Sequence, residues 1–297
     1  MSYALGLDIG GTNLKAVAVT PRGRTRLATS APTADTGTTD WIARVRELCA
    51  QVTRELGGPP AWTGVAAPGL AAADGSAINT MPARLAGLEG RNWSECLALP
   101  HRVPVLNDAH AALLGERWRG AARGTRHAVM LTLGTGVGGA AVVDGRLLRG
   151  HLGRAGHLGH VSLDPAGPLD VVNTPGSLED AIAEKSLGRR TGGRYASTAE
   201  MVAAVGTGDP FARAVWQTSV RALAAAVASF INAFGPEVVV IGGGIAKAGP
   251  ALFVPLAAHL DQFEWRPGGV RARIEPARLG DYAAAYGAAW NARRLRP

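Results

Sequence analysis

The chain has 297 residues, of which 47% are hydrophobic and 18% are charged, a balance that excludes an intrinsically disordered protein. Its formal net charge is +8, but three of the 31 basic residues are lysines and the others are scattered arginines, which argues against a nucleic-acid-binding patch and suits an anionic small molecule. The two cysteines, Cys49 and Cys96, exclude a disulfide framework and a cysteine-built zinc knuckle, and favour a reducing cytoplasmic setting.

The first residues and the apolar runs predict neither a secretory leader nor a membrane span. Residues 1–11 lack a positively charged start and already contain an acid, Asp8. The longest apolar helical candidate, 223–234, includes Ser229 and Asn232 and is shorter than the roughly 18 residues that a span needs. We therefore expect a soluble cytoplasmic protein with no membrane partner.

The first half of the chain predicts a β-hairpin followed by strands and helices in alternation. The expected elements are strands at 4–9, 14–20, 62–67 and 103–106, and helices at 39–56 and about 108–118. Gly10-Gly11 forms the turn of the hairpin, and Asn107-Asp108 directly follows the last of these strands.

The second half repeats this theme. Strands are expected at 128–133, 140–143 and 238–241, and helices at about 178–190, 198–205, 210–234 and 283–294. A strand, a glycine turn and a second strand thus occur near 5–19 and again near 128–143. The pattern predicts two α/β domains of related topology with a cleft between them and a linker near 107–125.

Three glycine-rich turns each follow a short apolar strand, at Gly10-Gly11, at 134–139 and at 242–244. Such turns expose consecutive backbone N–H groups to a phosphate, although each turn alone is equally typical of a tight hairpin. The first turn adds the Asp8 carboxylate for a hydrated metal ion, and the third suits the ribose and base of a nucleotide. No Walker motif is present, and the spacing disfavours a Rossmann domain.

These motifs together resemble the ROK family (repressors, ORFs and sugar kinases) of the actin-like, hexokinase-like ATPase superfamily. The resemblance runs from about Leu5 to Ala289 through five motifs: Asp8-Ile9-Gly10-Gly11-Thr12, Leu106-Asn107-Asp108, 133–139, Gly156-x-x-Gly159-His160 and 236–245. It implies two actin-like (ribonuclease H-like) α/β domains that flank a nucleotide–sugar cleft, usually in a homodimer. We place the smaller domain at 1–118 with 284–297 and the larger one at 119–283.

The resemblance also implies a role for each site residue. Asp108 would be the catalytic base, although Asn107-Asp108 could instead cap the following helix. Asp8 would hold Mg²⁺ through water, and Lys15, which could equally face solvent, would join it near the phosphates. Other expected contacts to the nucleotide and its phosphates are Gly10, Gly11, Thr12, Thr135, Gly136, Gly138, Gly243 and Gly244. Other expected contacts to the sugar are Gly69, Asn79, Asn107, His157, His160 and Glu179, of which Glu179 could instead serve the first turn of a helix.

Two positions depart from the family pattern. His157 stands where the family usually has a glutamate that grips sugar hydroxyls, so the identity of the sugar is open. Asp170, Val172 and Ser177 stand where relatives have the cysteines of a zinc knuckle, so we expect no zinc site.

The leading hypothesis is therefore a transferase, a glucokinase-like enzyme that uses ATP and Mg²⁺ to phosphorylate a hexose or a hexose derivative. One alternative is a kinase that uses polyphosphate, which would suit the positive net charge. A second is a sugar-binding regulatory protein with weak catalysis, which the retention of Asp8 and Asp108 disfavours. No DNA-binding segment precedes the first strand, so we expect no nucleic-acid partner.

Overall fold

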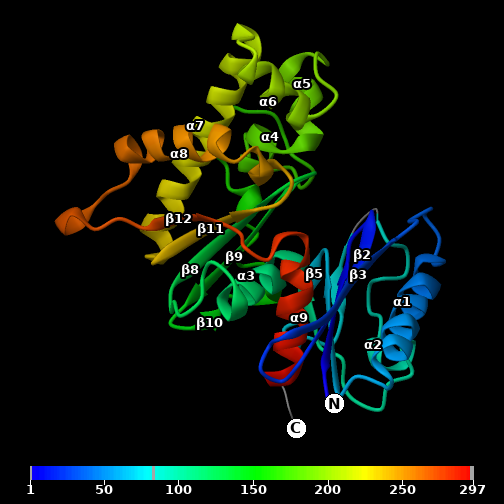
Figure 1. Cartoon of the computed structure of the whole chain (residues 1–297). Helices are drawn as coiled ribbons and strands as arrows, with labels where there is room; N and C mark the ends of the chain where they lie inside the picture. Colours follow the sequence, from blue (N-terminus) through cyan, green and yellow to red (C-terminus); the bar gives the residue numbers. More distant parts are fainter. Residues whose placement is uncertain (1, 82–83, 295–297) are drawn as a thin grey trace. The chain divides into compact units, whose positions relative to one another are not determined.

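The computed structural model describes residues 2–81 and 84–294, and it divides into two compact units (Figure 1). Unit 1 comprises Met1–Gly124, Leu147–Ala155 and Arg278–Pro297, and unit 2 comprises Thr125–Arg146 and Gly156–Ala277. The outermost residues of the predicted smaller domain, 1 and 295–297, lie outside the described residues.

Unit 1 is built on a five-stranded sheet in the order β3-β2-β1-β4-β7. Its strands are β1 (Ala4–Ile9), β2 (Asn13–Val19), β3 (Thr25–Pro32), β4 (Trp62–Ala67) and β7 (Val105–Asn107). The first three strands are antiparallel neighbours, whereas β1, β4 and β7 run parallel. A separate antiparallel pair, β5 (Leu70–Ala71) and β6 (Ile78–Thr80), follows β4.

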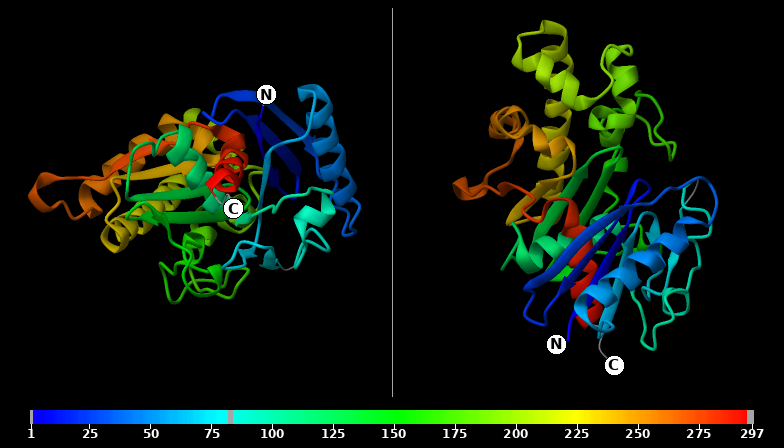
Figure 2. Two further views of the ribbon diagram at one scale, coloured as in Figure 1. Left: turned by 90° about the horizontal axis from the view of Figure 1, so that it is seen from below. Right: turned by 45° about the vertical axis from the view of Figure 1, so that its right-hand side comes forward.

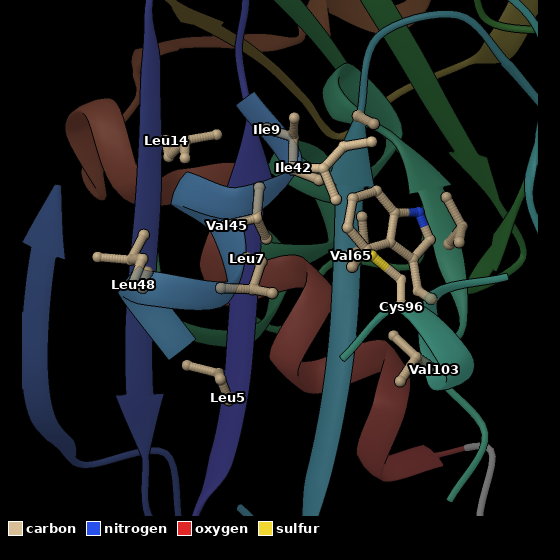
Figure 3. Close-up of a cluster of buried hydrophobic side chains, with 14 of the residues drawn as sticks. Leu5, Leu7, Ile9, Leu14, Ile42, Val45, Leu48, Val65, Cys96 and Val103 are labelled. Atoms are coloured by element: carbon tan, nitrogen blue, oxygen red, sulfur yellow. The ribbon is translucent and has the colours of Figure 1, made fainter. Parts of the chain in front are cut away.

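Helices cover both faces of this sheet (Figure 2, left). The helices of unit 1 are α1 (Trp41–Leu56), α2 (Trp93–Cys96), α3 (Asp108–Arg119) and α9 (Ala283–Arg294). Apolar residues three or four positions apart in α1 form one buried stripe, and Gly57 ends the helix with a φ of 73°. Figure 3 shows Ile42, Val45 and Leu48 of this stripe beside Leu5 and Leu7 of β1. Alternate residues of β1 therefore build a core with α1.

The opposite face of the sheet receives α9, which also packs against α3. Small residues let these backbones approach closely. A Cβ would overlap a carbonyl oxygen of α9 at each of three glycines: Gly6 at Ala285, Gly64 at Ala288 and Gly115 at Ala283. The seam thus requires glycine at these three positions.

Unit 2 has a sheet with the same pattern, in the order β10-β9-β8-β11-β12. Its strands are β8 (Ala128–Leu133), β9 (Val137–Val143), β10 (Arg146–Leu147), β11 (Val238–Gly242) and β12 (Arg273–Pro276). β8 and β9 are antiparallel, whereas β8, β11 and β12 run parallel. The repeated strand order confirms the predicted pair of α/β folds with related topology.

The helices of unit 2 gather around one long helix, α7. They are α4 (Leu178–Ile182), α5 (Leu187–Thr191), α6 (Thr198–Gly206), α7 (Pro210–Phe234) and α8 (Pro250–Phe263). By length and composition α7 could cross a membrane, but half of its most apolar stretch is buried inside the protein. It packs against α4, α6, α8 and β8, which accounts for its apolar composition.

The structure corrects several predicted elements. The predicted helix 178–190 is broken into α4, a 3-10 turn at Glu184–Ser186 and α5. The guanidinium of Arg190 donates to the carbonyl of Ala183 at 2.8 Å and to the hydroxyl of Ser219 at 2.8 Å, so it satisfies the backbone at the break. β3, β5, β6 and β12 were not predicted. β3 alternates between exposed and half-buried residues at a sheet edge, so it carries little apolar signal.

The domain limits also differ from those predicted. Residues 108–119 of the predicted linker form the buried helix α3, and the chain leaves unit 1 only after Gly124. Segment 147–155, predicted in the larger domain, belongs to unit 1 because Arg149 donates to the carbonyl of Ala73 and the His110 ring donates to that of Ala155, both at 3.0 Å.

Glu116 of α3 ties two distant parts of unit 1 together. Its side chain is fully buried and accepts hydrogen bonds from the N–H groups of Ala121 at 2.6 Å, Arg278 at 2.9 Å and Leu279 at 2.8 Å. These donors lie near the points where the chain first leaves unit 1, after Gly124, and last returns to it, at Arg278.

Candidate active site

The first glycine turn joins β1 to β2 in unit 1. The N–H of Gly10 donates to the carbonyl of Asn13 at 3.1 Å, and Thr12 is exposed beside it. Thr33, a fully buried residue that the sequence did not indicate, donates its hydroxyl to the carbonyl of Gly10 at 2.6 Å and its N–H to that of Thr12 at 2.9 Å. These two hydrogen bonds hold the turn against Thr33, the residue that follows β3.

Asp8 lies in β1 just before this turn and is 8% exposed. Lys15 pairs with it across the β1–β2 ladder, with Nζ 3.6 Å from Oδ2. Burial raises the pKa of Asp8 to about 7, and the charge of Asp108 adds to this rise while Lys15 opposes it. Lys15 is thus a strand residue whose partly exposed side chain is directed at Asp8, and its contact with a phosphate stays a prediction.

Sheet register brings Asp108 to the same edge as Asp8. Asp8 pairs with Ala66 of β4, and Ala66 pairs with Leu106 of β7. Because the three strands are parallel, their carboxyl ends meet at one edge, where α/β proteins commonly bind ligands. Asp108 follows β7 directly and is half-buried, so its carboxylate is held in place but remains accessible.

Asn107 performs the capping that the sequence left open for Asn107-Asp108. Its Oδ1 accepts from the N–H of Ala109 at 2.9 Å and of His110 at 3.2 Å, which caps α3. Its Nδ2 donates to the carbonyl of Gly69 at 3.0 Å. Gly69 has a φ of 100° and lies between β4 and β5, and Asn79 is exposed on β6. Unit 1 thus joins Gly69, Asn107 and Asp108.

The second glycine turn, in unit 2, is shorter than predicted. It covers Gly134–Gly136, because β9 begins at Val137 and Gly138 pairs with Thr132 inside the sheet. Segment 184–185 lies against the turn: the N–H of Glu184 donates to the carbonyl of Gly134 at 2.9 Å, and that of Lys185 to Thr135 at 3.2 Å. Gly138 is therefore a strand residue rather than part of the turn.

The third turn lies next to the second at the same sheet edge. β8 and β11 are parallel, and Thr132 pairs with Gly242. Gly243 has a φ of 89°, and a Cβ there would overlap the carbonyl of Leu133. Gly244 begins the 3-10 helix Ile245–Ala248 and has open space around its missing side chain. Only the first of these two glycines is required by close backbone contact.

Glu179 reaches the second turn from the first turn of α4. It is 5% exposed, and its Oε2 accepts from the N–H of Val137 at 2.8 Å. Its other oxygen forms an ion pair with Lys185. The sequence did not indicate Lys185, because this residue lies far along the chain from the second turn that it contacts.

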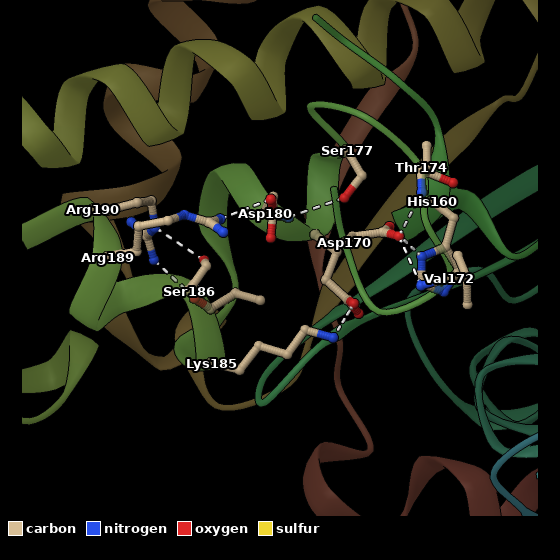
Figure 4. Close-up of polar contacts among 12 residues, drawn as sticks. His160, Asp170, Val172, Thr174, Ser177, Asp180, Lys185, Ser186, Arg189 and Arg190 are labelled. Atoms are coloured by element: carbon tan, nitrogen blue, oxygen red, sulfur yellow. Dashed lines mark hydrogen bonds and ion pairs between the residues drawn. The ribbon is translucent and has the colours of Figure 1, made fainter. Parts of the chain in front are cut away.

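His160 belongs to a polar cluster on the segment between β10 and α4 (Figure 4). Its Nδ1 lies 2.7 Å from Oδ2 of Asp170. His157, half-buried, precedes the 3-10 turn Leu158–His160. The ligand atoms of His160, Asp170 and Glu179 all lie within 4.8 Å of one another. Unit 2 thus brings together His160, Glu179 and the second turn.

A structural zinc ion does not fit this cluster well. Zinc sites of this kind use four ligands, usually thiolates and imidazoles. Both cysteines lie in or against the core around α1 in unit 1, Glu179 is paired with Lys185, and Asp170 already accepts several hydrogen bonds. The ammonium group of Lys185, which pairs with Glu179, would also repel a divalent cation.

The chain matches the model of the ROK family over residues 4–294. The chain belongs to the ROK family. It is 33% identical over 280 residues to a glucokinase of Thermotoga maritima, with 85% of each chain covered. A solved ROK hexokinase of Thermus thermophilus has a TM-score of 0.85 and 32% identity, with 98% of both chains covered.

A second structure, a ROK glucokinase of Streptomyces griseus in complex with glucose and AMPPNP, has a TM-score of 0.82 and 26% identity. It covers 99% of this chain and 100% of that one. These likenesses confirm the predicted family and its actin-like fold.

Proposed function

We propose that this ROK protein transfers the terminal phosphoryl group of ATP to a hydroxyl of a hexose or hexose derivative. The observation that carries the proposal is the position of Asp108 at the sheet edge that also holds Asp8 and the first glycine turn. Phosphoryl transfer needs a positioned base beside a phosphate cradle, and unit 1 supplies both. The similarity to proteins named glucokinase and hexokinase supports the same reaction.

In this proposal the residues divide the work. Asp108 accepts the proton of the attacking sugar hydroxyl, and Asn107, held by Gly69 and the start of α3, orients the sugar with Asn79, His157, His160 and Glu179. The turns at Gly10-Gly11 and Gly134–Gly136 offer backbone N–H groups to the phosphates, with Thr12 and Thr135 beside them. Gly243 and Gly244 serve the nucleoside side of ATP.

Magnesium fits the donor set at Asp8. Carboxylate oxygens are preferred ligands of Mg²⁺, and Asp8 is a buried carboxylate whose pKa is raised by burial and by a second carboxylate, Asp108. A bound Mg²⁺ would neutralise charge on the phosphate oxygens. Lys15 limits the repulsion at Asp8 before the nucleotide arrives.

The sugar is proposed to be glucose first, with mannose, fructose and N-acetylhexosamines as further candidates, because an imidazole at His157 offers fewer acceptors than a carboxylate. ATP is preferred to polyphosphate as the donor because the third glycine turn suits a nucleoside. We also propose a homodimer, which the family resemblance implies, and a cytoplasmic setting, which the low cysteine content favours.

An ADP-release assay across these sugars, with ATP and with polyphosphate, tests the proposal. The wild type should release ADP with at least one sugar, and Asp108→Ala should lower this rate by about 10²–10⁴. Asp144→Asn is the matched control, because Asp144 is an exposed turn residue with a positive φ that asparagine tolerates. No turnover with any pair of donor and sugar would overturn the proposal, and an active Asp108→Ala would overturn the choice of base.

A further inference from the structure

The loop from His160 to Ser177 is organised around the side chain of Asp170, which has no exposed surface. Its Oδ1 accepts from the N–H groups of Val172 and Thr174, both at 2.9 Å. The main chain of Asp170 adds two bonds, from its N–H to the carbonyl of Thr174 and from the N–H of Asn173 to its own carbonyl, both at 3.0 Å. One carboxylate oxygen is thus used to close the loop (Figure 4).

The second carboxylate oxygen is directed at His160. Oδ2 lies 2.7 Å from Nδ1, and the side chain of His160 is 26% exposed, so the imidazole is only partly covered by the protein. Short isolated bridges, Ser162 with Ser177 and Leu169 with Pro175, hold the two arms of the loop on either side of this contact. The position of the imidazole therefore follows from the loop that Asp170 closes.

The charge state of Asp170 fixes which nitrogen of His160 carries the proton. Burial pushes the pKa of Asp170 up, but hydrogen bonds from His160, from the backbone at Thr174 and Val172 and from Ser177 outweigh it, and the pKa lies below its usual value. An ionised carboxylate can only accept hydrogen bonds, so Nδ1 must donate. In the neutral ring Nε2 is then a lone-pair acceptor.

We propose that Asp170 is a positioning residue that holds His160 in the Nδ1–H tautomer, so that Nε2 accepts a hydrogen bond from a hydroxyl of the sugar. This inference rests on the proposed function, in which His160 contacts the sugar. It assigns to a carboxylate, with no metal ion, the two tasks of closing the loop and orienting the imidazole. Asp170 stands where the sequence comparison with the family placed a zinc-binding cysteine, and the donor set here does not fit zinc.

The substitution Asp170→Asn separates the two tasks. The side-chain carbonyl of the introduced asparagine can still accept from Val172 and Thr174, but its amide nitrogen faces His160 as a donor. Nδ1 must then accept, and the proton moves to Nε2, which becomes a donor. The loop is kept while the tautomer is reversed.

The tautomer is measured at pH 8 in the free protein by ¹⁵N NMR of the histidine rings, with His160→Gln used to assign the signals. The wild type should show a protonated Nδ1 and Asp170→Asn a protonated Nε2. Asp164→Asn, which changes another carboxylate that accepts a backbone N–H in the same loop, should leave the signals of His160 unchanged. A protonated Nε2 in the wild type overturns the proposal without any variant, as does one zinc ion per chain in elemental analysis.

Kinetics test the link to the sugar. Asp170→Asn should raise KM for the sugar by about tenfold and leave KM for ATP unchanged, because one hydrogen bond to the sugar is lost. A reversed tautomer with an unchanged KM for the sugar overturns the positioning role. If no sugar is turned over by the wild type, the proposed function fails, and the NMR result still reports on the tautomer.

Discussion

The two units place similar charged groups beside a glycine turn, but they take these groups from different elements. Both place a glycine turn after the central strand of a five-stranded sheet, and both place a buried carboxylate and a lysine beside that turn. In unit 1 the pair is Asp8 and Lys15, and in unit 2 it is Glu179 and Lys185. Similar sheets have thus acquired similar charges from different elements, since Asp8 belongs to β1 and Glu179 to α4.

The difference lies in what each carboxylate is bonded to. Glu179 accepts the N–H of Val137 and so holds the second turn in place. Within residues 2–81 and 84–294, the structure shows no backbone N–H donating to Asp8, and burial raises the pKa of this group to about 7. Burying a carboxylate with so few hydrogen-bond donors costs free energy, and a bound ligand that interacts with the carboxylate would reduce this cost. We infer that Asp8 is kept for a ligand, whereas one carboxylate oxygen of Glu179 fixes the shape of the turn.

Among the variants that test this difference, Lys185→Met should have the largest effect. Lys185→Met leaves the Glu179 carboxylate uncompensated beside the turn proposed to bind phosphate, and breaking such a buried pair is strongly unfavourable. We expect KM for ATP to rise by about 10- to 100-fold, measured by steady-state kinetics. Adding Glu179→Gln should restore most of the ATP affinity. A double variant no better than Lys185→Met would contradict the neutralising role.

The next largest effect is expected at the third turn, where the backbone of Gly243 lies close to that of Leu133. Gly243→Ala combines a positive φ with an overlap at the carbonyl of Leu133, so it should lower the free energy of unfolding by about 1–3 kcal/mol. Gly244→Ala, with open space and an ordinary φ, is the matched control and should change it by less than about 0.5 kcal/mol. Urea unfolding of both variants measures the difference, and equal losses would show that the backbone contact is not the cause.

A smaller effect is expected from Asp8→Asn, and its sign depends on pH. The pKa of Asp8 is raised from 3.8 to about 7 by folding, so the folded state binds this proton more tightly than the unfolded state. Its stabilising contribution is complete below pH 3.8 and is lost as the pH rises through about 7. Without Mg²⁺, Asp8→Asn should therefore melt a few degrees above the wild type at about pH 8 and near it at about pH 4. A difference in Tm that does not vary with pH would refute the raised pKa.

The sequence was sufficient for features that depend on neighbours along the chain. The strand that carries Asp8, the cap at Asn107 and the turn at 242–244 each rest on a few adjacent residues, and α9 was predicted with its observed limits. Thr33 and Lys185 could not be predicted in the same way, because each acts on a turn that lies far away in sequence. Gly138 was misplaced because a glycine run does not show where a strand resumes.

The seam between α9 and the sheet of unit 1 has a consequence for how the protein is made. The glycines at 6, 64 and 115 leave grooves that α9 fills, and the carboxylate of Glu116 finds two of its donors only at 278–279. The ribosome synthesises all of unit 2 before α9 exists. The part of unit 1 up to Gly124 therefore keeps the apolar surface that α9 covers exposed until α9 has been synthesised. We expect it to be the segment most dependent on chaperones during synthesis.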